Sequence, residues 1–335
     1  MDKIDFNFDA ADGKKIYGYK WGLEEGTSPK GVVQIAHGMA EYAARYDRFA
    51  KRLNERGYIV YANDHRGHGR TAEGLENVGY LGEDGYNWMV KDMYQLTGII
   101  KKENPSLKLF LYGHSMGSML SQRYISLYGS AINGVILSGT AGRQDFETKV
   151  GTRIAKKEFK KIGPKAKSEK MNSLTFGNYN KAFKPNRTDF DWLSRDTAEV
   201  DKYVNDPYCG GVFSAQFFCD FLPGLLETHK KSNVAKIPKD LPIYVTGGDK
   251  DPVGKNLKLV MPLINEYKSL GIKDVSFKFY KDARHEILNE TNRDEVMNDI
   301  IDWLDKHWRW LSHLFLMYNM YNIGYSGFKV GDNYG

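Results

Sequence analysis

The sequence lacks several features that mark out particular classes of protein. It has only two cysteines, Cys209 and Cys219, and their spacing suits neither a disulfide framework nor a cysteine-based metal site. It has no run of about 18 uncharged apolar residues, so we expect no helix that crosses a bilayer. Its first residues lack the basic and then apolar layout of a secretion signal. These absences predict a cytoplasmic protein without a disulfide or a metal centre.

The bulk composition is that of a soluble globular protein, with 41% hydrophobic and 27% charged residues. A length of 335 residues is enough for one large α/β domain with an inserted subdomain, or for two domains. The net charge of +6 is mild, and its most concentrated source lies between Lys149 and Lys170. We interpret this segment as a solvated helix face and expect no nucleic-acid partner, with attraction to anionic lipid headgroups as an alternative.

Strand and helix patterns alternate through both ends of the chain. Apolar runs predict strands, the first two of which are joined by an Asp-Gly turn, at residues 4–9, 14–21, 31–36, 58–63, 107–112, 133–138, 241–246 and 275–280. Amphipathic patterns predict helices at residues 46–56, 86–103, 256–269 and 293–306. The class is therefore α/β, with a mostly parallel sheet of about eight strands and helices on both faces.

About a hundred residues in the middle of the chain lack this alternation and have the pattern of helices and loops. We therefore divide the chain into a core at residues 1–140 and 239–307, a helical cap at 141–238 and a tail extension at 308–335. Apolar residues of the tail keep helical spacing, so the last helix is predicted to continue. We expect the tail to pack on the core, and transient contact of the tail or the cap with a membrane surface is the alternative. The pattern leaves the oligomeric state open.

The pentapeptide G-H-S-M-G at residues 113–117 matches the G-x-S-x-G pattern. It lies between a predicted buried strand and a predicted helix, which is the context that this pattern requires. Glycine on either side of Ser115 allows the chain to turn sharply and neighbouring backbone to approach. Such a turn exposes the Ser115 hydroxyl and directs amide N–H groups of the helix start toward it. We therefore predict that Ser115 is a nucleophile.

A serine nucleophile needs a base to take its proton and a carboxylate to orient that base. In sheets with this turn the three residues follow in the order Ser, Asp or Glu, His. His285 follows the strand ending at residue 280, whereas the other downstream histidines lie in the insertion or on the tail helix. His285 is therefore the predicted base. The loop after the preceding strand offers two candidate acids, Asp249 and Asp251, and spacing alone does not choose between them.

Two backbone N–H groups are needed to stabilise the oxyanion that forms during acyl transfer. One is predicted to belong to Met116, directly after the nucleophile, and the other to Met39, in the loop after the first buried strand. A glycine-bent loop beside this one contains Asp64, Arg66 and His68. We expect these three side chains to brace one another.

Five segments together resemble the signature blocks of the monoacylglycerol lipase and lysophospholipase branch of the α/β-hydrolases, which includes relatives of the serine aminopeptidases. They are H-G-M-A-E-Y-A-A-R-Y at 37–46, N-D-H-R-G-H-G-R-T at 63–71, G-H-S-M-G at 113–117, G-D-K-D-P-V at 248–253 and R-H-E at 284–286. The resemblance implies an α/β-hydrolase fold and hydrolysis of a single-chain lipid ester, under a helical cap that forms an acyl tunnel. It also favours Asp251 as the acid, because the family's acid precedes such a Pro-Val pair.

The insertion contains an aromatic stripe with helical spacing, formed by Phe213, Phe217 and Phe221. Such a stripe fits a core or a substrate-binding wall, and we carry both interpretations. The segment 191–195 is expected to anchor the cap.

The sequence thus predicts a serine hydrolase for lipid esters that needs no cofactor. The alternatives are a short-chain carboxylesterase, an aminopeptidase of the same fold acting on N-terminal proline, and a non-catalytic binding module. The last predicts a missing triad member, whereas all three residue types are present.

Overall fold

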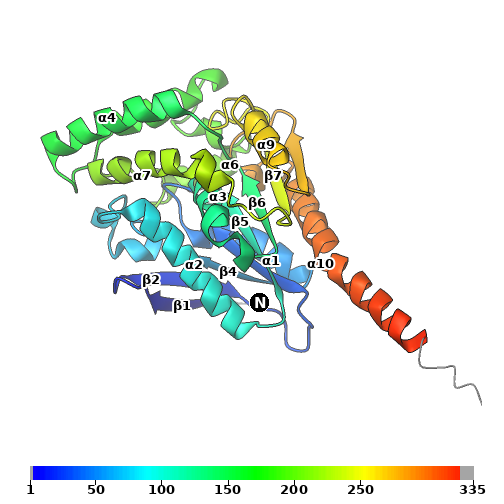
Figure 1. Ribbon diagram of the computed structural model, residues 1–335. Helices are drawn as coiled ribbons and strands as arrows, with labels where there is room; N and C mark the ends of the chain where they lie inside the picture. Colours follow the sequence, from blue (N-terminus) through cyan, green and yellow to red (C-terminus); the bar gives the residue numbers. More distant parts are fainter. Residues whose placement is uncertain (1–2, 325–335) are drawn as a thin grey trace, which may run out of the picture.

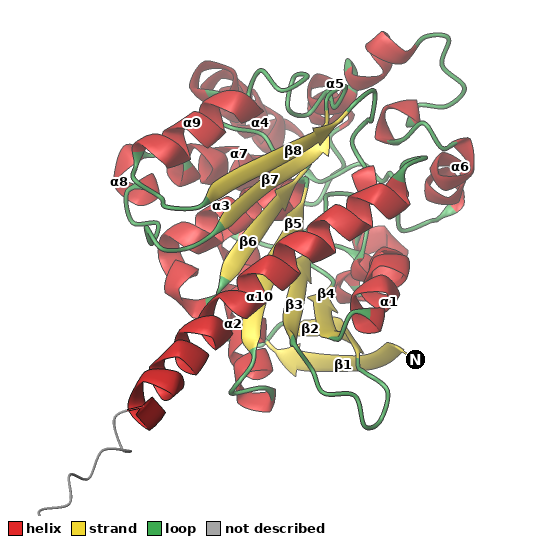
Figure 2. Cartoon of the chain, turned by 90° about the vertical axis from the view of Figure 1, so that its right-hand side faces the viewer, coloured by secondary structure: helices red, strands yellow, loops and turns green. Residues whose placement is uncertain are grey.

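The computed structural model describes residues 3–324, with side chains as far as Trp308. Its eight strands form one sheet in the order β1-β2-β4-β3-β5-β6-β7-β8 (Figure 2). The strands are β1 (Lys3–Asp9), β2 (Lys15–Trp21), β3 (Gly31–Ala36), β4 (Tyr58–Asn63), β5 (Lys108–His114), β6 (Gly134–Ser138), β7 (Ile243–Gly248) and β8 (Val275–Tyr280). The pairs β1–β2 and β2–β4 are antiparallel and all other pairs are parallel. The predicted mostly parallel sheet is confirmed.

Successive residues of the central strands serve two different cores, because side chains alternate between the faces of a sheet. In β3, Val32 packs into one core cluster and Val33 into the other. Helices α2 (Gly85–Glu103), α3 (Met116–Tyr128) and α9 (Val260–Ser269) cover the first face, whereas α1 (Asp47–Glu55) and α10 (Arg293–Gly324) cover the second. This burial on both faces explains why β3, β5, β6 and β7 are almost continuously apolar.

The strand register brings the ends of β3, β5 and β6 to one edge of the sheet. Ala36 of β3 pairs with Gly113 of β5, and His114 pairs with Ser138 of β6. The loops that leave these strands therefore start side by side, which is where α/β sheets gather their functional groups.

The chain between β6 and β7 is helical. It contains α4 (Asp145–Ile162), α5 (Glu169–Phe176), α6 (Thr197–Asn205), α7 (Ala215–Thr228) and α8 (Lys231–Val234). Helix α4 packs against α7, and Figure 1 shows the pair stacked beyond the end of the sheet. The predicted helical insertion is present, and its division from the core as a separate unit stays a prediction.

Short 3-10 helices connect the larger elements: Ala43–Tyr46 (η1), Gly69–Ala72 (η2), Leu75–Asn77 (η3), Gly129–Ala131 (η4), Tyr179–Phe183 (η5), Asp191–Leu193 (η6) and Ile287–Asn289 (η7). The last helix does continue into the tail, since α10 runs to Gly324. The sequence predicts that the tail packs on the core. This prediction concerns side chains beyond Trp308 and residues 325–335, which lie outside the described part of the structure. No helix within residues 3–324 is long and apolar enough to cross a membrane.

Candidate active site

Ser115 occupies the sharp turn between β5 and α3. Its backbone has φ 51° and ψ −119°, a strained conformation for a residue with a side chain. A Cβ at Gly117 would overlap the carbonyl oxygen of Ala36, and a Cβ at Gly113 would overlap the hydroxyl of Ser121. Only glycine therefore allows α3 to start this close to the end of β3. The sequence pattern predicted this turn, and the structure contains it.

His285 and Asp251 meet in the loops that follow β8 and β7. The His285 Nδ1 lies 2.9 Å from Asp251 Oδ2, and both side chains are buried. The other carboxylate oxygen of Asp251 accepts the N–H of Val253 at 2.9 Å. Asp249 instead accepts the N–H of Asp282 at 2.8 Å on the exposed side of the same loop. Of the two candidate acids, Asp251 is thus the one in contact with the imidazole.

The surroundings of His285 raise the pKa of its imidazole above the value that it has in water. Burial by itself lowers the pKa of His285, but the Asp251 carboxylate, its hydrogen bond and the nearby Glu286 and Glu41 outweigh burial and raise the pKa above the ordinary 6.5. With Nδ1–H donated to Asp251, Nε2 is the nitrogen left to accept a proton. This is the arrangement expected of a general base that holds a transferred proton.

A second histidine, His114, lies directly before Ser115, with its ring centroid 4.7 Å from that of His285. Burial and then the neighbouring His285 lower the pKa of His114 to about 3. Its Nδ1 lies 3.4 Å from the Ser138 hydroxyl, and no carboxylate among the described residues bonds to its ring. His114 thus lacks the carboxylate partner that His285 has.

Ser115 and His285 line the same cavity, together with Met39. The cavity encloses about 550 Å³ of space free of protein atoms, part of it open to solvent. Its wall from the insertion consists of Asn172, Phe176, Phe190, Trp192, Leu193, Tyr203, Gly210 and Gly211. The sequence pattern does not predict this wall, although it does predict that the segment 191–195 anchors the cap. The Trp192 ring lies 5.1 Å from the His285 ring, so the insertion is in contact with this predicted site residue.

The aromatic stripe of the insertion lies elsewhere. Phe213 and Phe217 are fully buried in the main core cluster, and Phe221 packs against the same cluster. The Phe217 and Phe221 rings stack at 5.0 Å, and Phe221 also meets Tyr86 of α2 at 5.7 Å. None of the three lines the cavity beside Ser115. The structure thus gives this stripe a packing role.

The loop after β3 is held in place by its own side chains. The Gly38 N–H donates to Glu41 Oε1 at 2.6 Å. His37 Nδ1 donates to the Gly38 carbonyl at 2.7 Å, while its Nε2 accepts the N–H of His65 at 2.9 Å. Within residues 3–324, neither the Met39 N–H nor the Met116 N–H donates to another protein group. Both N–H groups therefore lack a protein acceptor within the described part of the chain.

Arg45 joins this loop to the loop that carries His285. Its guanidinium contacts Glu41 at 2.6 Å and Glu286 at 2.8 Å, with all three side chains largely buried. Burial by itself raises the pKa of Glu286, but the charge and hydrogen bonds of Arg45 outweigh it and lower this pKa to about 2. Burial raises the pKa of Glu41, which shares the same guanidinium. The buried Arg45 guanidinium thus binds two carboxylates. Glu41 belongs to the loop that contains Met39, and Glu286 directly follows His285.

The prediction that Asp64, Arg66 and His68 brace one another is wrong in its pairing. Arg66 binds the carboxylates of Asp92 and Asp12 at 2.6 Å and 2.5 Å. Asp64 accepts backbone N–H groups of Ala43 and Arg70 at 2.9 Å each, and His68 contacts the Arg66 carbonyl. Asp64 also accepts the Tyr19 hydroxyl at 3.2 Å, so its partners come from other segments of the chain than the arginine. These side chains therefore brace the loop against its neighbours.

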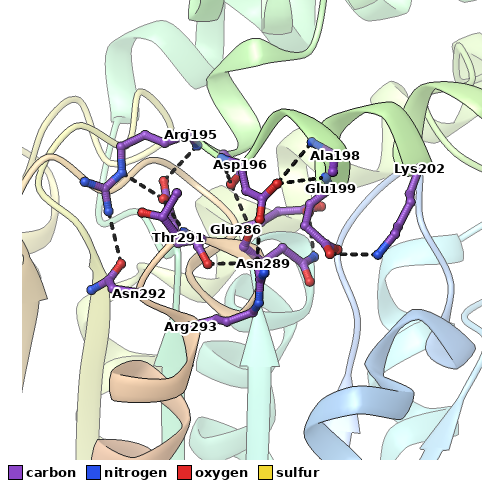
Figure 3. A network of polar contacts seen from close by, with 12 residues as sticks. Arg195, Asp196, Ala198, Glu199, Lys202, Glu286, Asn289, Thr291, Asn292 and Arg293 are labelled. Atoms are coloured by element: carbon purple, nitrogen blue, oxygen red, sulfur yellow. Dashed lines mark hydrogen bonds and ion pairs between the residues drawn. The ribbon is translucent and has the colours of Figure 1, made fainter.

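The segment after Trp192 is fastened to the loop that follows His285 (Figure 3). Arg195 Nε donates to the fully buried Glu290 at 2.8 Å, and Arg293 reaches back to Asp196 at 2.8 Å. The Ser194 hydroxyl donates to the Asn289 carbonyl at 2.8 Å. The predicted anchor at residues 191–195 is present. It fastens this part of the cavity wall to the loop that follows His285.

The sheet order, the strained serine turn and the loops at the strand ends together define an α/β-hydrolase fold. The chain belongs to the serine aminopeptidase S33 family, whose family model matches residues 27–292.

Similar proteins carry lipase and esterase names. The chain is 30% identical to a monoacylglycerol lipase of Mycolicibacterium smegmatis, covering 84% of this chain and 90% of that one. It is 26% identical to the human monoglyceride lipase, covering 88% of each chain. The solved structure of a thermostable carboxyl esterase from Bacillus coagulans superimposes with a TM-score of 0.84 at 30% identity, covering 92% of this chain and 99% of that one.

Proposed function

We propose that this protein is a serine hydrolase that cleaves carboxylic esters of single-chain lipids, of the monoacylglycerol lipase or lysophospholipase type. The observation that carries the proposal is the hydrogen bond of 2.9 Å between His285 and Asp251, at a cavity that Ser115 also lines. A hydroxyl on a strained turn, a base with a raised pKa and a carboxylate that orients the base are the three parts of a nucleophilic triad.

In the first half of the reaction, Ser115 attacks the ester carbonyl while His285 Nε2 accepts the hydroxyl proton. The negative charge that develops on the carbonyl oxygen is stabilised by the N–H groups of Met39 and Met116, each worth on the order of 3 kcal/mol in the transition state. Asp251 holds the imidazole in the required tautomer and stabilises its positive charge. His285 then returns the proton to the leaving alcohol.

In the second half, water replaces the alcohol and attacks the acyl group held on Ser115. His285 takes a proton from this water and returns it to Ser115, which frees the carboxylic acid. Protein groups alone supply the proton transfers and the charge stabilisation in both halves, so no step requires a cofactor.

The substrate class rests on two kinds of support. The cavity wall is largely apolar, with Phe176, Phe190 and Leu193 among its residues, as suits an acyl chain. The relatives named above are called monoacylglycerol and monoglyceride lipases. The similarity to the Bacillus coagulans carboxyl esterase supports a second candidate, a carboxylesterase for shorter chains.

A substrate panel separates these candidates. Purified protein is assayed with monoacylglycerols, with lysophosphatidylcholine, with p-nitrophenyl esters of increasing chain length and with prolyl-naphthylamide. We expect the highest kcat/KM on a monoacylglycerol or lysophospholipid, and no turnover by the Ser115→Ala variant. A maximum at acetyl or butyryl esters would favour the short-chain esterase, and turnover of prolyl-naphthylamide alone would favour the aminopeptidase.

A further inference from the structure

Most of the net charge of this protein lies on one segment of the insertion. Between residues 145 and 170 there are nine Lys or Arg against four Asp or Glu, a net +5 of the +6 of the whole chain. Six of the basic residues belong to helix α4, namely Lys149, Arg153, Lys156, Lys157, Lys160 and Lys161. The remainder of the protein is thus nearly neutral, and its positive charge is local.

The basic residues of α4 share one face of the helix. At about 3.6 residues per turn, all six lie within an arc of about 140°, and Phe146 and Val150 lie within the same arc. The opposite side carries Thr148 and Ala155, the two buried residues of α4, and the helix packs against α7. Figure 1 shows α4 as the outermost layer of the insertion, on the side of α7 away from the sheet. The basic face therefore points outward.

The six basic residues of α4 outnumber its three acidic residues, Asp145, Glu147 and Glu158. The acidic residues at the start of α4 are already paired, Asp145 with Arg143 at 2.7 Å and Glu147 with Lys255 at 3.2 Å. Within the described part of the chain, none of the six basic side chains of α4 forms an ion pair. The face is therefore free to bind anions outside the protein.

Two large apolar side chains among these charges are exposed to solvent, one of them largely and the other in part. Phe146 is 77% exposed and Val150, one turn later, is 37% exposed. Moving exposed apolar side chains from water into an apolar phase is favourable in free energy. Lysines that surround exposed aromatic and aliphatic groups on one helix face are the pattern of a helix that lies in a lipid headgroup layer. A nucleic-acid backbone would match the charge but would leave Phe146 in water.

We propose that the outward face of α4 is a docking surface for an anionic lipid bilayer. The lysines and Arg153 bind headgroup phosphates, and Phe146 with Val150 enters the boundary between the headgroups and the acyl chains. Docking would hold the insertion, and so the cavity beneath it, at the layer where single-chain lipid esters reside. The docking itself does not rest on the proposed hydrolysis, and it is tested separately from it.

The test is vesicle binding by the full chain in the Ser115→Ala form, so that no lipid is consumed. Co-sedimentation is measured with vesicles of phosphatidylcholine alone and with 30% phosphatidylglycerol. We expect the protein to bind the anionic vesicles, and raising NaCl from 0.1 M to 0.5 M should weaken this binding because screening lengths shorten. Replacing Lys156, Lys157, Lys160 and Lys161 by Gln should lower the partition coefficient about 100-fold or more. Phe146→Ser should lower it about tenfold.

A matched control replaces four exposed lysines elsewhere, Lys91, Lys101, Lys102 and Lys306, by Gln. It removes the same net charge and should change binding at most severalfold. Two controls show that the variants fold. Their melting temperatures should be unchanged, and the same substitutions made in the protein that retains Ser115 should leave hydrolysis of a soluble ester unchanged.

Three results would overturn the proposal. They are absence of binding to the anionic vesicles, binding that the α4 variant retains, and equal loss in the α4 and control variants. Binding of a DNA duplex by the α4 face without vesicle binding would assign it to nucleic acid instead.

Discussion

Arg45 and Glu286 form a bidentate ion pair across 241 positions of the sequence, with Nη1 2.8 Å and Nη2 2.9 Å from the two carboxylate oxygens. The same guanidinium contacts Glu41 at 2.6 Å, and Glu41 holds the Gly38 N–H. Glu286 follows His285 directly in the chain. The two loops that carry the proposed oxyanion donor and the proposed base are therefore connected through one buried cation.

We expect Arg45→Met to destabilise the fold by about 3–5 kcal/mol, because it leaves two buried carboxylates without a counterion. Urea unfolding measures this loss. The control Arg52→Met removes a surface pair with Glu55, whose side chains are 41% and 60% exposed, and should cost about 1 kcal/mol or less. Equal effects of the two substitutions would contradict the buried connection.

The activity should depend on pH through His285. Because only the neutral imidazole accepts a proton, kcat/KM should rise with pH through an apparent pKa above 6.5, the direction in which Asp251 shifts the pKa of His285. A neutral soluble ester is the appropriate substrate, since it does not titrate itself. A midpoint below 6.5 would show that the carboxylate does not act on this base.

The two aspartates of the loop after β7 provide a matched pair of variants. Asp251→Asn should lower kcat by about 10³- to 10⁴-fold, because the imidazole loses the partner that fixes its tautomer. It should also move the midpoint of the pH profile to lower pH. Asp249→Asn weakens only the contact with the Asp282 N–H and should leave kcat within a few fold. If the Asp249 variant lost more activity than the Asp251 variant, the acid would be misassigned.

The serine turn should not tolerate a side chain at Gly117. In Gly117→Ala the new Cβ would overlap the Ala36 carbonyl, which is backbone and cannot rotate away. We expect a loss of stability of about 2 kcal/mol or more and a loss of activity, because α3 must shift from β3. Gly98→Ala in α2 meets no atom within 4 Å and should stabilise the protein by about 0.5–1 kcal/mol. Thermal unfolding of both variants tests this contrast.

The central strands could be predicted because they are buried on both faces, and the edge strand β8 because its residues alternate between aromatic or β-branched and polar side chains. The predicted strands at 31–36, 58–63 and 275–280 agree with β3, β4 and β8 to the residue. The serine turn was also predictable, since its glycines and serine form a short pattern that is visible in the sequence, although the contact that requires Gly117 is made with Ala36 of β3. Local patterns of this kind need no knowledge of distant residues.

The insertion was less predictable because its helices pack against neighbours on more than one side, so that a single apolar stripe does not reveal which face lines the cavity. Helix α7 lies against α4 on one side and against α2 and α3 on the other, so its phenylalanines serve the core. The cavity wall comes instead from α5, η6 and α6 and the residues around them, where Phe176, Trp192 and Tyr203 show no period. The partners of Arg45 and Arg66 are likewise set by the folded arrangement and not by local spacing.

The central claim is that Ser115 is a nucleophile activated by His285, and covalent labelling tests it most directly. The protein is treated with a fluorophosphonate and the modified peptide is identified by mass spectrometry. We predict one label, on Ser115, formed rapidly in the unmodified protein, very slowly in His285→Ala and not at all in Ser115→Ala. A label on another residue, or equal labelling rates with and without the imidazole of His285, would contradict the account.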